Sequence, residues 1–188
     1  MEKETIRDIK SLFFALRNGE IADRLRKAGS PYKIIFGLLL PQIEMVAGSV
    51  EPSVELAETL WANTSTRESR LMATMVYPLE AFTVAKAKEW VADCDTVELV
   101  DLLCFRLVRH LPEAEELLME NLKAEAAPMM RYFALRLAMN LLVIGNLFEK
   151  DKVYAFALEE GNRADCKSKM LCRQVQEEIE WQKEEEGL

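Results

Sequence analysis

Apolar residues recur every three or four positions along almost the whole chain, which is the spacing of one face of an α-helix. The segment 128–144 shows this best, because its apolar residues form one stripe: Met130, Phe133, Ala134, Leu137, Ala138 and Leu141. No stretch alternates apolar and polar residues for long enough to indicate a β-strand. The sequence therefore predicts an all-α protein.

Turn and capping residues divide this pattern into about ten helices. Ser65 with Glu68 and Asp95 with Glu98 have the spacing of capping boxes, which place helix starts near Thr66 and near 95. Prolines open or end other helices, because proline is tolerated only in the first turn. We expect helices over 2–17, 20–28, 79–92, 95–109, 128–144, 148–160 and 164–182, with further helices opened by Pro41, Pro52 and Pro112.

The spacing of three prolines indicates how these helices are organised. Pro41, Pro78 and Pro112 lie 37 and 34 residues apart, each at a junction between helical hairpins. This spacing is close to that of a two-helix repeat, in which each hairpin buries its open face on the next. We predict an α-α superhelix of HEAT-like hairpins, forming a single domain over 1–188. An irregular helical bundle is the alternative.

Composition and charge narrow the class of protein. Of the 188 residues, 50% are hydrophobic and 30% are charged, which is typical of a globular domain. The net charge of −8 argues against nucleic acid, but the expected acidic helix end at 175–188 holds six Glu and one Lys. The rest of the chain is much closer to neutral, so a local basic face remains possible.

Several classes of site lack support in the sequence. Four cysteines form no Cys-x-x-Cys pair and His110 is the only histidine, so we expect no metal and interpret the cysteines as thiols in a reducing compartment. No glycine-rich phosphate loop or Gly-x-Ser-x-Gly elbow is present, so no cofactor is expected. No run of eighteen apolar residues and no signal core occur. We therefore expect a cytoplasmic protein with no membrane partner.

Three stretches resemble the AlkD-type DNA alkylation repair family, whose members are HEAT-like helical proteins. The first is IIFGLLLPQIEMVAG, with Phe36-Gly37 and Pro41. The second is LAETLWANTSTRESRLMATMV, with Leu60-Trp61, Glu68, Arg70 and Ala73. The third is VELVDLLC, with Glu98 and Asp101 at the acidic positions. Their order and spacing within 34–145 carry the resemblance.

The resemblance implies a protein that binds DNA on a concave basic face and excises N3- or N7-alkylated purines as a DNA glycosylase. Asp101 would be the catalytic residue, because a carboxylate stabilises the positive charge that develops on the sugar and orients a water. Val97 stands where the family has tryptophan, and Met129 or Met130 stands where it has another aromatic. The aromatic cradle is therefore expected to be absent.

Basic side chains on later helices are the candidates for phosphate contacts. The candidate nucleic-acid-binding residues are Arg70, Arg106, Arg109, Arg131, Arg136, Lys169 and Arg173. An alternative is that these cations form ion pairs with the abundant glutamates and that Asp101 pairs with an arginine for structural reasons. The protein would then be a non-catalytic scaffold for a protein partner. Binding of another nucleic-acid structure is a third hypothesis.

Overall fold

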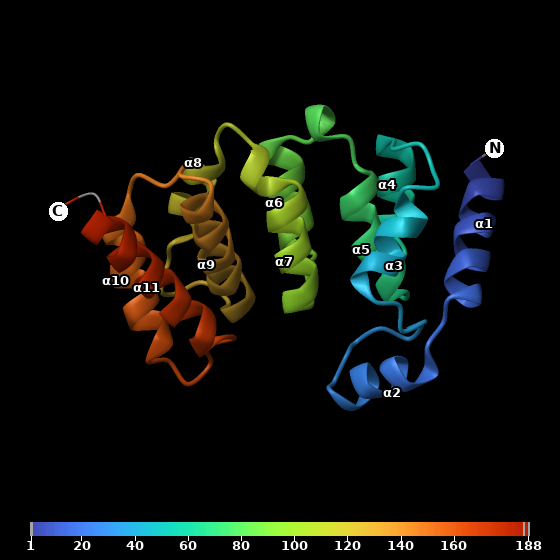
Figure 1. The fold of residues 1–188 in the computed structure, drawn as a ribbon, viewed down its shortest axis with the longest axis horizontal. Coiled ribbons are helices and arrows are strands. Elements are labelled where there is room, and N and C mark those ends of the chain that lie inside the picture. The colour runs from blue at the N-terminus through green and yellow to red at the C-terminus, as the bar shows by residue number, and fades with distance from the viewer. Residues whose placement is uncertain (1, 186, 188) are drawn as a thin grey trace. The chain divides into compact units, whose positions relative to one another are not determined.

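A computed structural model describes residues 2–185 and 187 of the chain (Figure 1). This part contains eleven α-helices and two short 3-10 helices, and no β-strand beyond one isolated bridge between Ile34 and Thr66. The predicted all-α fold of helical hairpins is confirmed. No helix in the described range is long and apolar enough to span a lipid bilayer. A cytoplasmic location stays a prediction.

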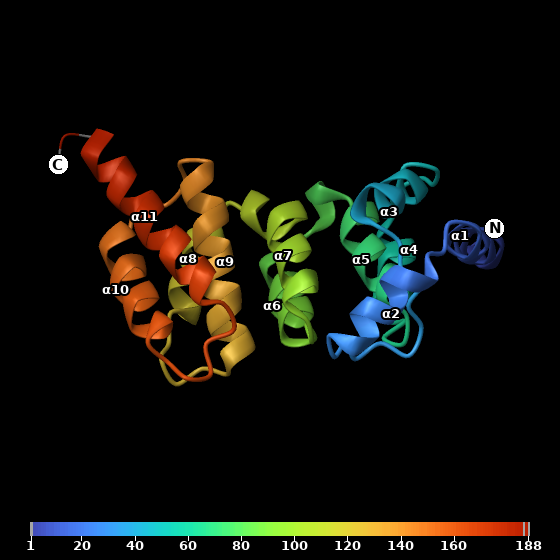
Figure 2. The same cartoon turned by 60° about the horizontal axis from the view of Figure 1, so that its bottom comes forward.

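The chain packs as two compact units, Met1–Phe82 and Thr83–Leu188. A single domain over 1–188 stays a prediction. Each unit has its own set of helices, as the views in Figures 1 and 2 show. The N-terminal unit holds α1 (Glu2–Ala15), α2 (Gly19–Lys27), α3 (Leu40–Ala47), α4 (Val54–Trp61), α5 (Arg67–Val76) and the 3-10 helix η1 (Leu79–Ala81).

Helix α5 is the centre of the N-terminal unit, because it packs against both α3 and α4. Its charged residues Arg67, Glu68 and Arg70 are buried along with most of its apolar ones. Glu68 does not form the expected capping box with Ser65, since Thr66 is the N-cap residue of α5. The Glu68 carboxylate instead accepts hydrogen bonds from backbone N–H groups of the 36–38 loop.

The C-terminal unit is built around α9, which packs against α7, α8 and α11. Its helices are α6 (Val84–Ala92), α7 (Val97–Arg106), η2 (Val108–His110, a 3-10 helix), α8 (Ala114–Asn121), α9 (Pro128–Val143), α10 (Lys150–Gly161) and α11 (Lys169–Glu185). Helices α10 and α11, the last two of the chain, pack on each other as a hairpin (Figure 1). The stripe predicted over 128–144 is therefore the core of this unit.

Three helix boundaries differ from the expected ones for local reasons. The expected helix 79–92 is interrupted, because the Thr83 side chain caps α6 by accepting a hydrogen bond from the Lys86 N–H. Thr96, and not Asp95, caps α7 by accepting from the Leu99 N–H. The helix expected to reach Arg109 ends at Arg106 and gives way to η2. Hydroxyl caps thus set two of these three boundaries.

Candidate nucleic-acid interface

Asp101 lies on α7 and faces two side chains of α9. The Tyr132 hydroxyl donates a hydrogen bond of 2.7 Å to Asp101 Oδ1. Arg136 Nε lies 2.6 Å from the same oxygen, and Arg136 Nη2 donates to the Tyr132 hydroxyl at 3.1 Å. Tyr132 and Arg136 are four residues apart, so one face of α9 carries both. The structure thus brings together two of the predicted site residues, Asp101 and Arg136.

The Asp101 carboxylate is held in place without being sealed from solvent. Its side chain is 38% exposed and that of Arg136 is 26% exposed. Burial raises the pKa of the Asp101 carboxyl above its ordinary value, although the hydrogen bond from Tyr132 and the charge of Arg136 each lower it. Burial also raises the pKa of Tyr132 to about 12. Tyr132 is therefore a neutral donor at physiological pH, and the Asp101 carboxylate keeps exposed surface on which a ligand can act.

The surface next to Asp101 carries an aromatic ring and two arginines. Phe105 lies one turn after Asp101 on α7 and is 44% exposed. The Arg109 guanidinium carbon lies 3.9 Å from the centre of the Phe105 ring, and that of Arg106 lies 5.7 Å from it. The pKa of His110 is lowered by burial and by the charge of Arg109. This surface thus combines two cations with a partly exposed aromatic ring.

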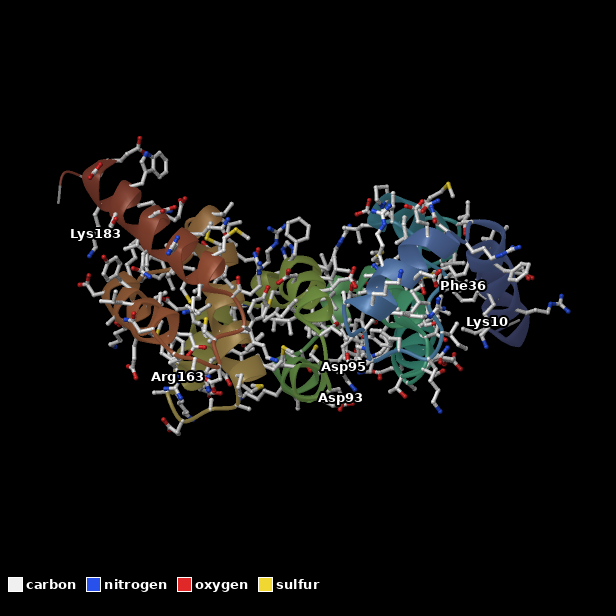
Figure 3. All side chains as sticks on the ribbon, turned by 90° about the horizontal axis from the view of Figure 1, so that it is seen from below. Lys10, Phe36, Asp93, Asp95, Arg163 and Lys183 are labelled. Carbon is white, nitrogen blue, oxygen red and sulfur yellow. The ribbon has the colours of Figure 1, made fainter. Side chains whose placement is uncertain are left out.

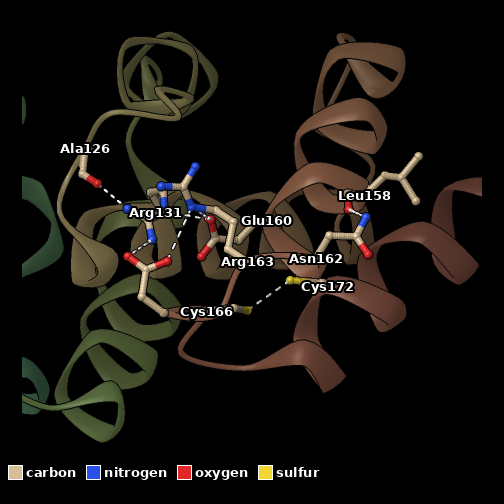
Figure 4. Close-up of polar contacts among 9 residues, drawn as sticks. Ala126, Arg131, Leu158, Glu160, Asn162, Arg163, Cys166 and Cys172 are labelled. Atoms are coloured by element: carbon tan, nitrogen blue, oxygen red, sulfur yellow. Dashed lines mark hydrogen bonds and ion pairs between the residues drawn. The ribbon is translucent and has the colours of Figure 1, made fainter.

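Arg131 is placed inside the C-terminal unit. It is 2% exposed, and its Nε lies 2.6 Å from Glu160 Oε2 while its Nη2 lies 2.9 Å from Asp165 Oδ2 (Figure 4). It also donates to the backbone carbonyl of Ala126. Its guanidinium group therefore joins α9 to the end of α10 and the following loop, where a phosphate does not reach it.

The remaining candidate cations belong to helices other than α7 and α9. Arg70 belongs to the N-terminal unit, is 2% exposed and stacks on Trp61, with its guanidinium carbon 4.2 Å from the ring centre. Lys169 and Arg173 are exposed in the first turns of α11. Arg70 therefore has a packing role, whereas Lys169 and Arg173 keep surfaces that phosphate can reach.

Tyr132 and Phe105 are the site residues that the sequence argument missed. Val97, at the position of the family's tryptophan, starts α7 and is 38% exposed. Val97, Asp101 and Phe105 follow at four-residue spacing and so share one face of α7. That spacing was the available signal for Phe105. The partner of Asp101 on α9 had no such signal, because it depends on how two helices pack.

No group of three or more histidine, cysteine, aspartate or glutamate side chains in the described range is placed to hold a metal ion.

Comparison with known proteins identifies the family. Residues 9–150 match the family described as DNA alkylation repair enzyme. This match covers most of the chain and includes both Asp101 and Arg136, so the protein belongs to the DNA alkylation repair enzyme family. No curated protein and no solved structure matches the chain.

Proposed function

We propose that the protein binds DNA through the surface around Asp101 and excises N3- or N7-alkylated purines as a DNA glycosylase. The observation that carries this proposal is the partly exposed Asp101 carboxylate held by Tyr132 and Arg136. The family match supports a role in alkylation repair.

The chemistry asked of Asp101 is electrostatic. An alkylated purine carries a positive charge and leaves as a neutral base when the bond between C1′ of the sugar and the base nitrogen breaks. Positive charge then grows on the sugar, and a carboxylate nearby stabilises it. Water adds at C1′ and releases a proton. Arg136 and Tyr132 fix the direction of the carboxylate, and both favour its ionised form against the larger effect of burial, which raises its pKa.

The surface beside Asp101 supplies the DNA contacts in this proposal. Arg106 and Arg109 would neutralise phosphates, and Lys169 and Arg173 are further candidates on α11. Phe105 would offer an aromatic face to an unstacked base, where the family's tryptophan is replaced by Val97. A cationic base is attracted to such a ring. The proposed site thus contains an aromatic ring on the C-terminal side of the carboxylate.

Release of free alkylated purine from methylated duplex DNA tests the proposal. The protein is expected to raise the rate of release above the spontaneous rate, and heat-denatured protein is the control. A rate equal to the spontaneous one, with duplex binding intact, would reject the glycosylase reaction and leave DNA binding in place.

A non-catalytic helical scaffold is the second candidate. The observation that favours it is the burial of Arg70 and Arg131, which removes two of the predicted phosphate contacts. Binding to duplex DNA at several salt concentrations separates the two functions, because each neutralised phosphate steepens the loss of affinity with salt. If the protein does not bind duplex DNA at low salt, the scaffold function is the one that remains.

A further inference from the structure

The N-terminal unit contains a basic pocket that the proposed function does not use. It has a volume of about 670 Å³, and its lining includes the cations Arg17, Arg26 and Lys33 with Phe14 and Phe36, but no acidic side chain. The segment 17–33 that supplies these cations holds five Lys or Arg residues and two acidic ones, in a chain of net charge −8. The pocket is therefore a positive site in an acidic protein.

Backbone contacts hold together the two segments that line this basic pocket, the start of α2 and the 33–38 loop. The Asn18 N–H donates to the Phe36 carbonyl at 2.8 Å, which ties the start of α2 to the 33–38 loop. Gly37 has a φ of +78°, and a Cβ placed there would lie 2.1 Å from the Asn18 carbonyl oxygen. Only glycine permits this approach. Phe36, labelled in Figure 3, packs on Phe13 with ring centres 5.7 Å apart.

Glu68 holds the 33–38 loop from inside the unit. Its carboxylate accepts from the N–H groups of Phe36, Gly37 and Leu38 at 3.1, 2.9 and 3.3 Å. Its charge is matched by Arg67, whose Nη1 donates to Glu68 Oε1 at 3.0 Å. Since Glu68 is 0% exposed, it shapes the pocket without presenting negative charge to it.

Two of the three cations have unused hydrogen-bonding capacity. Arg17 lies on the Phe14 ring, with its guanidinium carbon 3.8 Å from the ring centre, and uses Nη1 to donate to the Phe14 carbonyl at 2.7 Å. The other N–H groups of its guanidinium have no partner within the described part of the chain. Lys33 is exposed and likewise has no acidic partner there. Arg26 is committed to Asp23, with Nη1 2.9 Å from Oδ1.

We propose that this basic pocket binds a phosphate group through Arg17 and Lys33. A guanidinium and an ammonium together suit a phosphate, since the planar fork donates in pairs and the ammonium adds a point charge. The volume exceeds that of one anion, and it falls in the range of small-molecule sites. The Phe14 ring and Ile34, which is 45% exposed, give an apolar surface for the sugar or base attached to the phosphate.

The phosphate can belong to a DNA strand or to a free nucleotide, and two binding assays distinguish these sources. The first follows a fluorescein-labelled unmodified duplex by anisotropy between 50 and 200 mM salt. The second follows deoxyadenosine 5′-monophosphate by isothermal titration calorimetry. Both use the full chain, as wild type and as the double variant Arg17→Gln/Lys33→Gln. The matched control is Arg24→Gln/Lys27→Gln, which removes the same charge from the same segment outside the pocket lining.

Loss of two phosphate contacts lowers the slope of log affinity against log salt by about two, so affinity falls about tenfold less over this salt range. If this lower slope occurs in the pocket variant and not in the control variant, the pocket binds a DNA strand. Loss of nucleotide binding in the pocket variant alone assigns it to a free nucleotide.

Pocket and control variants with equal behaviour in both assays would overturn the proposal, as would absence of binding by the wild type in both. The glycosylase proposal rests on Asp101 in the other unit and is tested by alkylpurine release, so its failure is a separate result.

Discussion

Tyr132 donates a hydrogen bond of 2.7 Å to the Asp101 carboxylate, and this contact joins α9 to α7 at the candidate site. The hydroxyl stabilises the ionised form of Asp101 and so lowers its pKa, in opposition to burial. Arg136 donates to the same hydroxyl and its Nε also lies 2.6 Å from Asp101 Oδ1, so the three side chains contact one another. The contact therefore orients the Asp101 carboxylate and favours its ionised form.

Replacing Tyr132 by phenylalanine is expected to raise the pKa of Asp101 further, because burial is then opposed by Arg136 alone. If ionised Asp101 supports purine release, activity falls as the pH drops through this pKa. The acidic limb of the pH–rate profile should therefore move to higher pH in Tyr132→Phe, and at high pH the rate should change little.

The control for this shift is Tyr154→Phe, since the Tyr154 hydroxyl donates to Glu180 at 2.6 Å and is distant in sequence from Asp101. An acidic limb that stays in place in Tyr132→Phe would show that this hydrogen bond does not tune the carboxylate.

The buried ion pair between Arg131 and Glu160 predicts a large stability effect. Both side chains are almost fully buried, so Glu160→Gln leaves the Arg131 charge with only the exposed Asp165 as a partner. Breaking a buried pair in this way costs about 3–5 kcal/mol of unfolding free energy. Urea denaturation followed by circular dichroism measures it.

Lys152→Gln is the comparison for that measurement, because Lys152 pairs with Glu149 on the surface, with side chains 67% and 48% exposed. Its loss should cost less than about 1 kcal/mol. Equal losses in the two variants would mean that the Arg131–Glu160 pair adds no more than a surface contact.

Gly37 and Gly29 differ in a way that separates backbone strain from steric overlap. Both have positive φ, +78° and +87°, but a Cβ on Gly29 meets no atom within 4 Å. Gly29→Ala should therefore cost only the strain of about 1–2 kcal/mol. Gly37→Ala adds the overlap with the Asn18 carbonyl, so we expect a cost of about 3 kcal/mol or more. Chemical denaturation of the two variants side by side tests this order, and the reverse order would contradict it.

The helical fold followed from the sequence because its signal is local. The stripe over 128–144 and the proline spacing both report on short segments, and α9 formed as the centre of its unit. The capping-box pattern predicted the wrong N-cap residue where a neighbouring hydroxyl side chain caps the helix. Thr96 caps α7 in place of Asp95, and Glu68 satisfies backbone groups about thirty residues earlier in the chain. Contacts between residues so far apart in the sequence do not appear in its hydrophobic periodicity.

The candidate site was predicted only in part, for a similar reason. Asp101 was found by its place in a motif, but the choice among the arginines required knowing the face of α9 that meets α7. Arg131 and Arg136 are five residues apart, so they point to different sides of the helix. One pairs with Asp101 and the other with Glu160.

Single-turnover release of N7-methylguanine from methylated duplex DNA by wild-type protein and by Asp101→Asn tests the central claim most directly. Asparagine keeps the shape and can still accept the Tyr132 hydrogen bond, but it removes the charge. Asp151→Asn, on an exposed aspartate of α10, is the matched control. We predict that release by Asp101→Asn is roughly a hundredfold slower, with duplex binding unchanged. Release by Asp101→Asn at the wild-type rate would contradict the role given to this carboxylate.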